Sequence, residues 1–273
     1  MRKLIIIAAL VLLPNLALAK NLYIPWTSQA PMGNWSEPWQ NACEETSLVM
    51  LDYYYKNDRN LTKEIATQAI SKKLADKNMS LGKSLDENSD TIIKLVDYFS
   101  DWHAYAVENP TVADIKNELE SGRPVIGLFY APALNNNQYH YPVAVYHVLV
   151  IKGYDDNTNE FITNDPGTSS GLDYRYSYTT ILNALHDYLP DKQTASGKKI
   201  AIFTSAPNPY FTAQTLIKTK DNPAVYLVIG NVKRHIINET VFLANGWHWQ
   251  DIKLVSEGLL AGVPNGKIII NIE

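Results

Sequence analysis

A single cysteine, Cys43, stands in this chain of 273 residues. One cysteine cannot form an intramolecular disulfide. Without the first 19 residues the chain keeps roughly 254, enough for a sizeable core and one or two domains. The thiol is a reactive group, one half of an intermolecular bridge or a buried structural group, and its neighbours must decide between these interpretations.

The first 19 residues have the pattern of a secretory signal peptide. Arg2 and Lys3 are followed by an apolar run over 4–13, and Ala17-Leu18-Ala19 offers small residues before a cut at Lys20. The run is shorter than the roughly 20 apolar residues of a membrane span. We therefore expect a secreted, periplasmic or cell-surface protein with no integral membrane span after cleavage. The alternative is an uncleaved N-terminal anchor.

The charge balance argues against two classes of partner. The chain carries 24 basic and 28 acidic side chains. Loss of Arg2 and Lys3 with the signal peptide would leave a net charge of about −6. A chain this acidic is not expected to bind nucleic acid or anionic membrane surfaces.

Hydrophobic periodicity predicts both helices and strands in the main part of the chain. Thr62, Ser89 and Thr111 are candidate N-terminal caps of three of the helices. Helices are expected over 43–55, 61–75, 84–100, 111–122 and 179–188. Strands are expected over 22–26, 102–107, 125–130, 143–153, 160–164, 174–178 and 199–204.

A change of composition at Ser205-Ala206-Pro207-Asn208-Pro209 indicates a domain boundary. The sequence thus divides into a signal peptide (1–19), a main domain (20–205) and a small C-terminal α+β module (206–273). Short elements of the module are expected at 215–218, 224–229, 233–237, 238–243, 255–260 and 267–272. The module is either a stabilising appendage or an anchor for a cell wall or substrate.

Cys43 lies where the helix over 43–55 begins, a position that favours a reactive thiol. The free N–H groups of a helix N-terminus help a thiol to ionise. Glu44 and Glu45 oppose ionisation, because two carboxylates follow the thiol directly. A basic partner is therefore required.

His147 is the candidate base among six histidines, because it lies in the strongest predicted strand, 143–153, which pairs in a hairpin with 160–164. Antiparallel pairing of 143–153 with 160–164, centred near Asp156, brings His147 opposite Asp165 within about one residue. Asp165 would then orient the imidazole and stabilise its charged form. A slip of one residue would give this role to Asn164.

An oxyanion hole needs hydrogen-bond donors aimed at the developing charge. The main-chain N–H of Cys43 is one candidate. Gln40 is the candidate side-chain donor, and Gln29 is the alternative.

In this order, these segments resemble the C39-like cysteine peptidases, papain-fold relatives of the bacteriocin-processing peptidases. The matching segments are Ile24-Pro25, Ser28-Gln29, Cys43-Glu44-Glu45-Thr46-Ser47, His147, Gly153-Tyr154-Asp155 and Asn164-Asp165-Pro166-Gly167. The resemblance covers about residues 22–204. It implies a papain-like α+β fold with Cys43 as nucleophile, His147 as base and Asp165 as orienting group.

Two positions depart from the pattern of that family. Its members usually carry Gly after the nucleophile, where this chain has Glu44. They also carry Gln about six residues before the nucleophile, where this chain has Glu37.

The resemblance implies an exported cysteine peptidase that acts on peptides or proteins through a thioester acyl-enzyme. Alternatives are an amidase or endopeptidase acting on cell-wall peptides, and a non-catalytic binding protein in which the glutamates keep the thiol protonated. No cofactor is expected. The run Asp155-Asp156-Asn157-Thr158-Asn159 begins like a calcium loop, but it lacks Gly at the sixth position and Glu at the twelfth, so a turn is expected.

Overall fold

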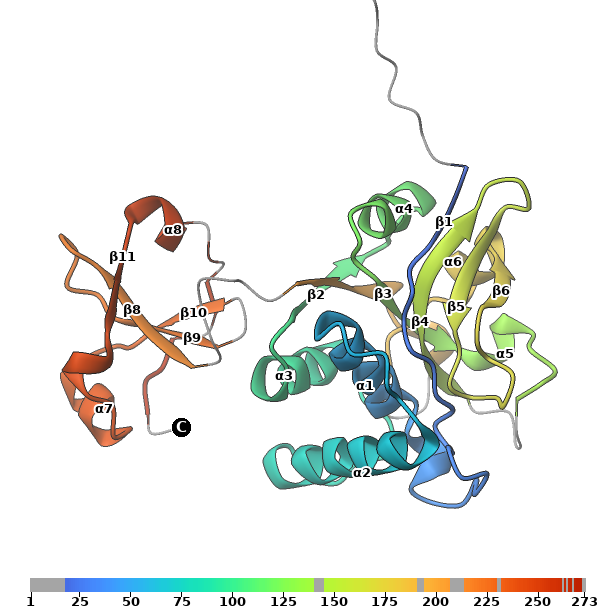
Figure 1. The fold of residues 1–273 in the computed structure, drawn as a ribbon, viewed down its shortest axis with the longest axis horizontal. Coiled ribbons are helices and arrows are strands. Elements are labelled where there is room, and N and C mark those ends of the chain that lie inside the picture. Colours follow the sequence, from blue (N-terminus) through green and yellow to red (C-terminus); the bar gives the residue numbers. More distant parts are fainter. Residues whose placement is uncertain are drawn as a thin grey trace, which may run out of the picture.

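The structure of the protein is a computed structural model in which two separate β-sheets are each accompanied by helices (Figure 1). It describes residues 18–139, 145–190, 194–206, 214–229, 232–261, 263, 265–266 and 268–271. The predicted α+β class with an antiparallel sheet is confirmed. The predicted signal peptide lies outside the described residues, apart from Leu18 and Ala19.

The larger sheet has seven strands in the order β2-β7-β3-β4-β5-β6, with β1 pairing with β4. All of its strand pairs are antiparallel. Its strands are β1 (Ala19–Asn21), β2 (His103–Glu108), β3 (Val125–Tyr130), β4 (Tyr146–Asp155), β5 (Glu160–Asn164), β6 (Tyr174–Ser177) and β7 (Ile200–Ser205).

Helices α1, α2 and α3 form the helical part of this lobe (Figure 1). Helix α1 packs against β4 and α2, and α3 packs against β2 and β7. Leu48 and Leu51 of α1 are buried with Val148 and Val150 of β4 in one core, as their helical and strand spacing predicts. The helical segments are η1 (Trp39–Asn41), α1 (Cys43–Tyr55), α2 (Lys63–Ser80), α3 (Ser89–Phe99), α4 (Val112–Glu120), α5 (Ala131–Leu134), α6 (Tyr178–Ala184) and η2 (Thr194–Ser196).

Two of the three predicted caps are confirmed. Thr62 accepts a hydrogen bond from the main-chain N–H of Ile65, and Thr111 forms a capping box with Asp114. The third is wrong, because Asn88 caps α3 and Ser89 is its first residue.

The strand predicted over 22–26 is also wrong. The pairing segment lies earlier, at β1, and only the Leu22 N–H still bonds to β4, through the Lys152 carbonyl. The chain then leaves the sheet toward Pro25, which has no N–H to donate. Gly153 makes room for β1, because a Cβ there would lie 2.4 Å from the Lys20 carbonyl oxygen.

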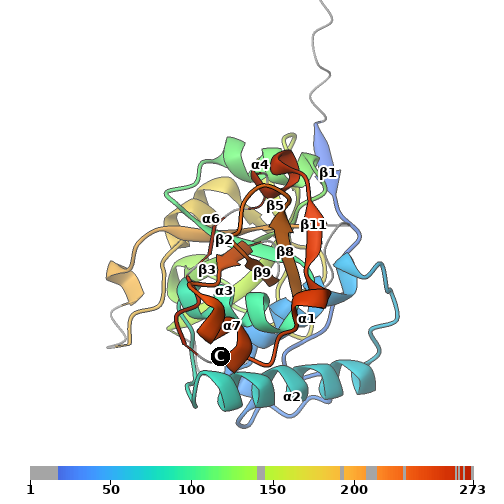
Figure 2. The same ribbon diagram turned by 90° about the vertical axis from the view of Figure 1, so that its left-hand side faces the viewer.

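The C-terminal elements form a second, smaller lobe, which faces the viewer in Figure 2. Its sheet has the order β10-β9-β8-β11, and its buried side chains form clusters of their own. Trp249 stacks on Phe242 with ring centroids 4.2 Å apart, so this tryptophan packs against a core residue of the lobe. The elements are β8 (Thr215–Thr219), β9 (Tyr226–Ile229), β10 (Val232–His235), β11 (Lys253–Val255), α7 (Glu239–Ala244), η3 (Trp249–Asp251) and α8 (Glu257–Ala261).

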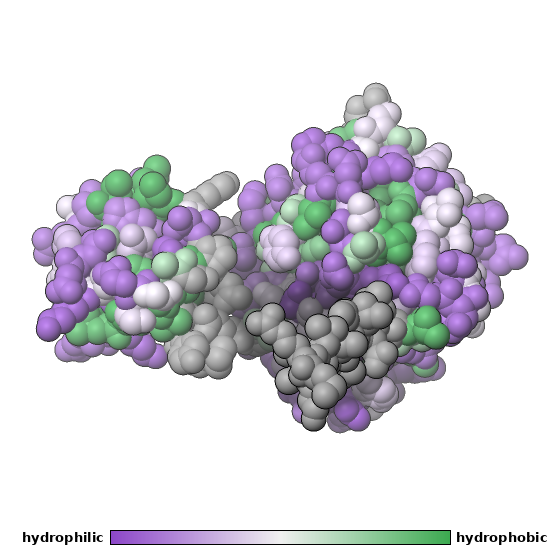
Figure 3. Space-filling view, turned by 90° about the horizontal axis from the view of Figure 1, so that it is seen from above, coloured by the Kyte–Doolittle hydropathy of each residue, from purple (hydrophilic) through white to green (hydrophobic). Residues whose placement is uncertain are grey.

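The face seen from above is largely hydrophilic on both lobes, with scattered apolar patches (Figure 3). Within the described part of the chain, no helix is long and apolar enough to cross a membrane. The predicted boundary at residues 205–209 follows β7 directly, and the division into 20–205 and 206–273 stays a prediction.

Candidate active site

Cys43 is the first residue of α1, and it is buried where this helix meets β4. The preceding residue, Ala42, offers no side-chain cap, and the N–H groups of Glu44 and Glu45 donate to the carboxyl groups of these same residues. The main-chain N–H of Val148 hydrogen-bonds to the sulfur and favours the thiolate. Cys43 therefore contacts Val148, the residue that follows His147 in β4.

The thiol is nevertheless held in its protonated form by its surroundings. Its S–H donates to Oε2 of Glu44 at 3.1 Å. Burial raises the pKa of Cys43 well above its usual value, and the nearby charges of Glu44 and Asp86 raise it further. Burial, with the charges of Glu45 and Asp86, also raises the pKa of the Glu44 carboxyl.

His147 and Asp165 form a buried pair. Nε2 of His147 and Oδ1 of Asp165 are 2.7 Å apart, so the ring N–H donates to the carboxylate. Tyr139 packs edge-on against the imidazole with centroids 4.9 Å apart. On another side lies Gly167, where a Cβ would come within 2.7 Å of the ring. The ring is thus fixed in orientation, and its Nδ1 is left without a hydrogen bond to any residue that the structure describes.

The strand register behind this pair differs from the predicted one. Asp155 pairs with Glu160, and after a bulge between Ile151 and Gly153 the last pair is Val150 with Asn164. The turn is centred beyond Asp156, so His147 and Asp165 lie diagonally across the ladder instead of opposite each other. Diagonal neighbours remain within reach of a long side chain such as His.

Asp165 is surrounded by donors that favour its charged form. Burial raises the pKa of this carboxyl, but the charge of His147 and the hydrogen bonds outweigh burial, so its pKa lies below the usual value. Besides His147, the donors are the hydroxyl of Tyr176 at 2.7 Å, the N–H of Gly167 at 2.9 Å, the hydroxyl of Tyr139 at 3.1 Å and the amide of Asn136 at 3.5 Å.

Asn164, the alternative orienting residue, has a different partner. Its amide donates to the Ile24 carbonyl at 3.1 Å, and its Oδ1 has no hydrogen-bond partner in the described structure. The structure thus places Asp165, and not Asn164, against His147.

Neither candidate oxyanion glutamine has a free amide. Gln40 is exposed and donates to Glu37 on the surface. Gln29 is buried, and its amide donates to the carbonyls of Trp39 and Gln40 at 3.0 and 2.8 Å. Gln29 therefore braces the turn before Cys43. The main-chain N–H of Cys43 is left as the donor best placed by its position in the fold.

Glu45 is compensated by a buried cation from the next helix. Nζ of Lys77 lies 2.7 Å from Oε1 of Glu45 and 3.3 Å from Oε1 of Glu87. The N–H of Glu87 in turn donates to Oε1 of Glu44 at 2.9 Å. The two glutamates after the thiol are therefore parts of a buried network that joins α1, α2 and the segment before α3.

Sequence reasoning missed the side chains that surround this site. Tyr139, Tyr176 and Asn136 all bond to Asp165, and Lys77 compensates Glu45. Tyr176 lies in β6, which pairs with β5, so the pairing of these two strands could have indicated that Tyr176 lies near Asp165. Lys77 carried no such signal, because nothing in a helical charge pattern distinguishes a buried lysine from an exposed one.

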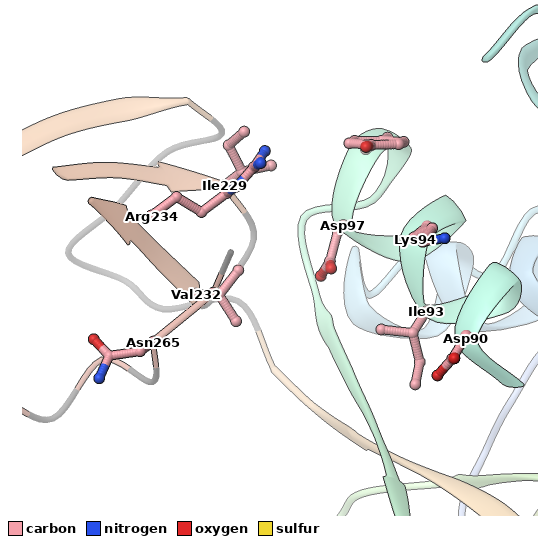
Figure 4. A pocket seen from close by; sticks show the side chains of 10 residues that line it. Asp90, Ile93, Lys94, Asp97, Ile229, Val232, Arg234 and Asn265 are labelled. Atoms are coloured by element: carbon pink, nitrogen blue, oxygen red, sulfur yellow. The ribbon is translucent and has the colours of Figure 1, made fainter. Parts of the chain in front are cut away.

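No group of three or more His, Cys, Asp or Glu among the described residues could hold a metal ion. A pocket of about 550 Å³ lies between α3 and the smaller lobe (Figure 4). In it, Asp90 and Asp97 come from α3, while Val232 and Arg234 come from β10. It contains neither Cys43 nor His147, so it is separate from the candidate active site.

The sequence profile of the Peptidase_C39 like family matches residues 21–196. A solved structure provisionally named a C39-like peptidase from Bacillus anthracis is similar, at 17% sequence identity and a TM-score of 0.44. The similarity covers 68% of this chain and 97% of that one. None of the curated proteins compared with this chain matches it. The family match spans more than half of the chain and includes Cys43, His147 and Asp165.

Proposed function

The chain belongs to the Peptidase_C39 like family, and we propose that it is a cysteine peptidase with Cys43 as nucleophile, His147 as base and Asp165 as orienting group. The observation that carries the proposal is the 2.7 Å pair of His147 and Asp165, buried beside the strand residue that contacts the thiol. Because Nε2 donates to Asp165, the other ring nitrogen is the one free to accept a proton.

The reaction would proceed by acyl transfer. Nδ1 of His147 takes the proton of the Cys43 thiol, and the thiolate sulfur attacks the carbonyl carbon of the scissile peptide bond. The N–H of Cys43 stabilises the oxyanion that forms. The imidazolium then gives its proton to the leaving amine nitrogen, which leaves a thioester on Cys43. His147 next takes a proton from water as that water attacks the thioester, and the acid product leaves while the thiol is restored.

The hydrogen bond from the thiol to Glu44 defines the resting state of this mechanism. The S–H must leave Glu44 for His147 before the sulfur can attack. Asp165 stabilises the imidazolium that this transfer creates. This stabilisation offsets the unfavourable effect of the Glu44 carboxylate on the ionisation of the thiol.

Replacing Cys43 by Ala tests the proposal. Hydrolysis of casein or of purified peptidoglycan, and labelling by a thiol-directed probe, should both disappear. Casein cleavage would indicate a protein peptidase, and release of wall peptides would indicate the cell-wall alternative. Hydrolysis that persists in the Cys43→Ala variant would contradict the assigned nucleophile.

A non-catalytic binding protein is the second candidate, and the raised pKa of Cys43 favours it. Burial and Glu44 hold this thiol protonated, so such a protein would react with iodoacetamide slowly and only at high pH. Rapid alkylation near neutral pH would exclude this candidate.

We also propose export by cleavage of the predicted signal peptide after Ala19. The sequence pattern of residues 1–19 supports this proposal. N-terminal sequencing of the protein from culture fluid or periplasm should begin at Lys20, whereas a retained Met1 would contradict cleavage.

A further inference from the structure

A pocket of about 250 Å³ adjoins the segments that carry the candidate active site. Trp26, Trp35, Met32 and Leu61 supply its large apolar side chains. Lys63 is the one charged residue among those that line it. The pocket is thus predominantly apolar, with a cation from the start of α2.

The segment that lines the pocket is hydrogen-bonded to the chain around Asp165. The Trp26 indole N–H donates to the Asp165 carbonyl at 3.2 Å. The Gln29 N–H and the Ser28 hydroxyl donate to the Pro166 carbonyl at 3.0 and 3.3 Å. Ser169, a few residues further along the same segment, also lines the pocket.

The same loop is tied to the nucleophile. The amide of Gln29 donates to two carbonyls of the turn that leads into Cys43. The pocket therefore lies between the segment before the nucleophile and the segment after Asp165, and its position relative to both is fixed by hydrogen bonds. Neither Cys43 nor His147 lines the pocket. Ser28 in its wall bonds to Pro166, whose neighbours Asp165 and Gly167 lie against His147.

The lining determines what can enter. Indole faces and a thioether bind apolar groups, and a charged side chain would lose its water without gaining a partner over most of the surface. Met32 is 63% exposed, and its flexible side chain can adjust to aliphatic or aromatic occupants. Trp26 and Leu61 pack against the main core and form the rigid part of the wall.

We propose that this pocket is a specificity subsite that binds a large apolar side chain of the peptide substrate close to the scissile bond. The inference rests on the proposed peptidase function. It adds that cleavage is selective for Leu, Met, Phe or Tyr at one fixed position relative to the bond.

The first test measures selectivity with the whole protein. Peptides that vary at one position at a time are expected to show a preference of about tenfold or more for a large apolar residue over Ala at one position. Met32→Glu should remove most of that preference by lowering the cleavage of the peptide that carries the large apolar residue. Met79→Glu is the matched control, because Met79 is an exposed methionine of α2 outside the pocket, and it should keep the wild-type preference.

The second test does not depend on turnover. The Cys43→Ala chain labelled with 5-fluorotryptophan is titrated with N-acetyl-phenylalanine amide or N-acetyl-alanine amide. The ¹⁹F resonances of Trp26 and Trp35, assigned with Trp→Phe variants, should shift with the phenylalanine compound only. Trp249, in the smaller lobe, serves as the internal control and should not shift.

The two tests separate the subsite from the chemistry. Cleavage without an apolar preference, or ¹⁹F spectra in which Trp26 and Trp35 do not respond, would overturn the subsite and leave the peptidase proposal standing. Selective shifts at Trp26 and Trp35 in a protein that cleaves no peptide would support the subsite and count against the peptidase proposal.

Discussion

The charged form of the buried Asp165 carboxylate is stabilised by its neighbours. Five groups donate to it, and its lowered pKa keeps it ionised at neutral pH. A carboxylate in this position fixes the tautomer of His147 and stabilises its protonated form.

Asp165→Asn should lower kcat by about 100-fold or more, because an amide can present its NH₂ to Nε2 and favour the wrong tautomer. Peptide hydrolysis at saturating substrate measures this. Asn164→Ala is the contrasting variant. It removes a buried hydrogen bond and should lower the free energy of unfolding by about 1–3 kcal/mol. Because Asn164 bonds to Ile24 and not to His147, the kcat of the folded protein should change little. Equal losses of kcat in both variants would contradict the assignment.

Glu44→Gln should make Cys43 more reactive at lower pH. After burial, the Glu44 carboxylate is the largest cause of the raised pKa of Cys43, so a neutral amide lowers that pKa. The profile of iodoacetamide alkylation against pH should therefore move to lower pH. Glu64→Gln, an exposed first-turn glutamate of α2, should leave the profile unchanged. A wild-type profile in Glu44→Gln would show that burial alone controls the thiol.

The same variant should change how stability depends on pH. Since the pKa of Glu44 is raised in the folded state, its contribution is complete below its unfolded pKa of about 4.3 and is lost as pH rises through the folded value. Glutamine does not ionise, so the Glu44→Gln variant does not lose stability in this way. The Tm of Glu44→Gln relative to wild type should therefore increase as pH rises above about 4.3.

Among the elements, α1 and α2 are joined by the most deeply buried ion pair of the described chain. Lys77 and Glu45 have side-chain exposures of 1% and 0%. A buried carboxylate that loses its cation is strongly destabilising, whereas removal of both charges is tolerated.

Lys77→Met should lower the free energy of unfolding by about 3–5 kcal/mol, and the double variant Lys77→Met/Glu45→Gln should recover part of that loss. Urea denaturation followed by circular dichroism measures both. Lys72→Met is the control on the same helix. Its pair with Asp76 is exposed on the lysine side, so its effect should stay within about 1 kcal/mol. A double variant less stable than Lys77→Met would show that the pair is not the source of the effect.

The sequence was most informative where local patterns determine an element. The predicted bounds of α1, β3 and β5 agree with the structure, because Leu48 and Leu51 repeat at helical spacing and β3 is a short apolar run between breakers. The hairpin was predicted, but its register was not, because no local pattern indicates the bulge between Ile151 and Gly153, where β4 also pairs with β1. The predicted contact between His147 and Asp165 is found despite the wrong register, because a long side chain reaches a diagonal neighbour.

The surroundings of the site were beyond prediction from one sequence. Tyr139 and Tyr176 are separated from Asp165 by loops and strands whose path depends on the whole sheet. Gln40 illustrates the reverse case, since its sequence position favoured an oxyanion role while the structure shows it donating to Glu37 at the surface.

For the whole molecule, the two lobes have cores that share no described residue. The main cluster ends with Phe203, and the two C-terminal clusters begin at Leu216 and Ile217. Each lobe therefore has the means to fold without the other.

A chain of residues 20–206 should fold cooperatively and keep the reactivity of Cys43 within about twofold of the full chain, because each domain has its own core. Thermal unfolding and iodoacetamide labelling test this. A truncated chain without a cooperative transition would show that the smaller lobe stabilises the larger one, through the surfaces that border the pocket in Figure 4.

The first strand has a consequence for the order of events in biogenesis. Ala19 and Lys20 pair with Asp155 and Tyr154, so the proposed cleavage point lies inside β1. A processing enzyme needs its scissile bond extended and unpaired, and a bond whose residues pair with β4 does not offer that. Cleavage of this precursor is therefore expected while the chain is still unfolded during translocation. A precursor that folded first would be protected at this bond and would keep its leader.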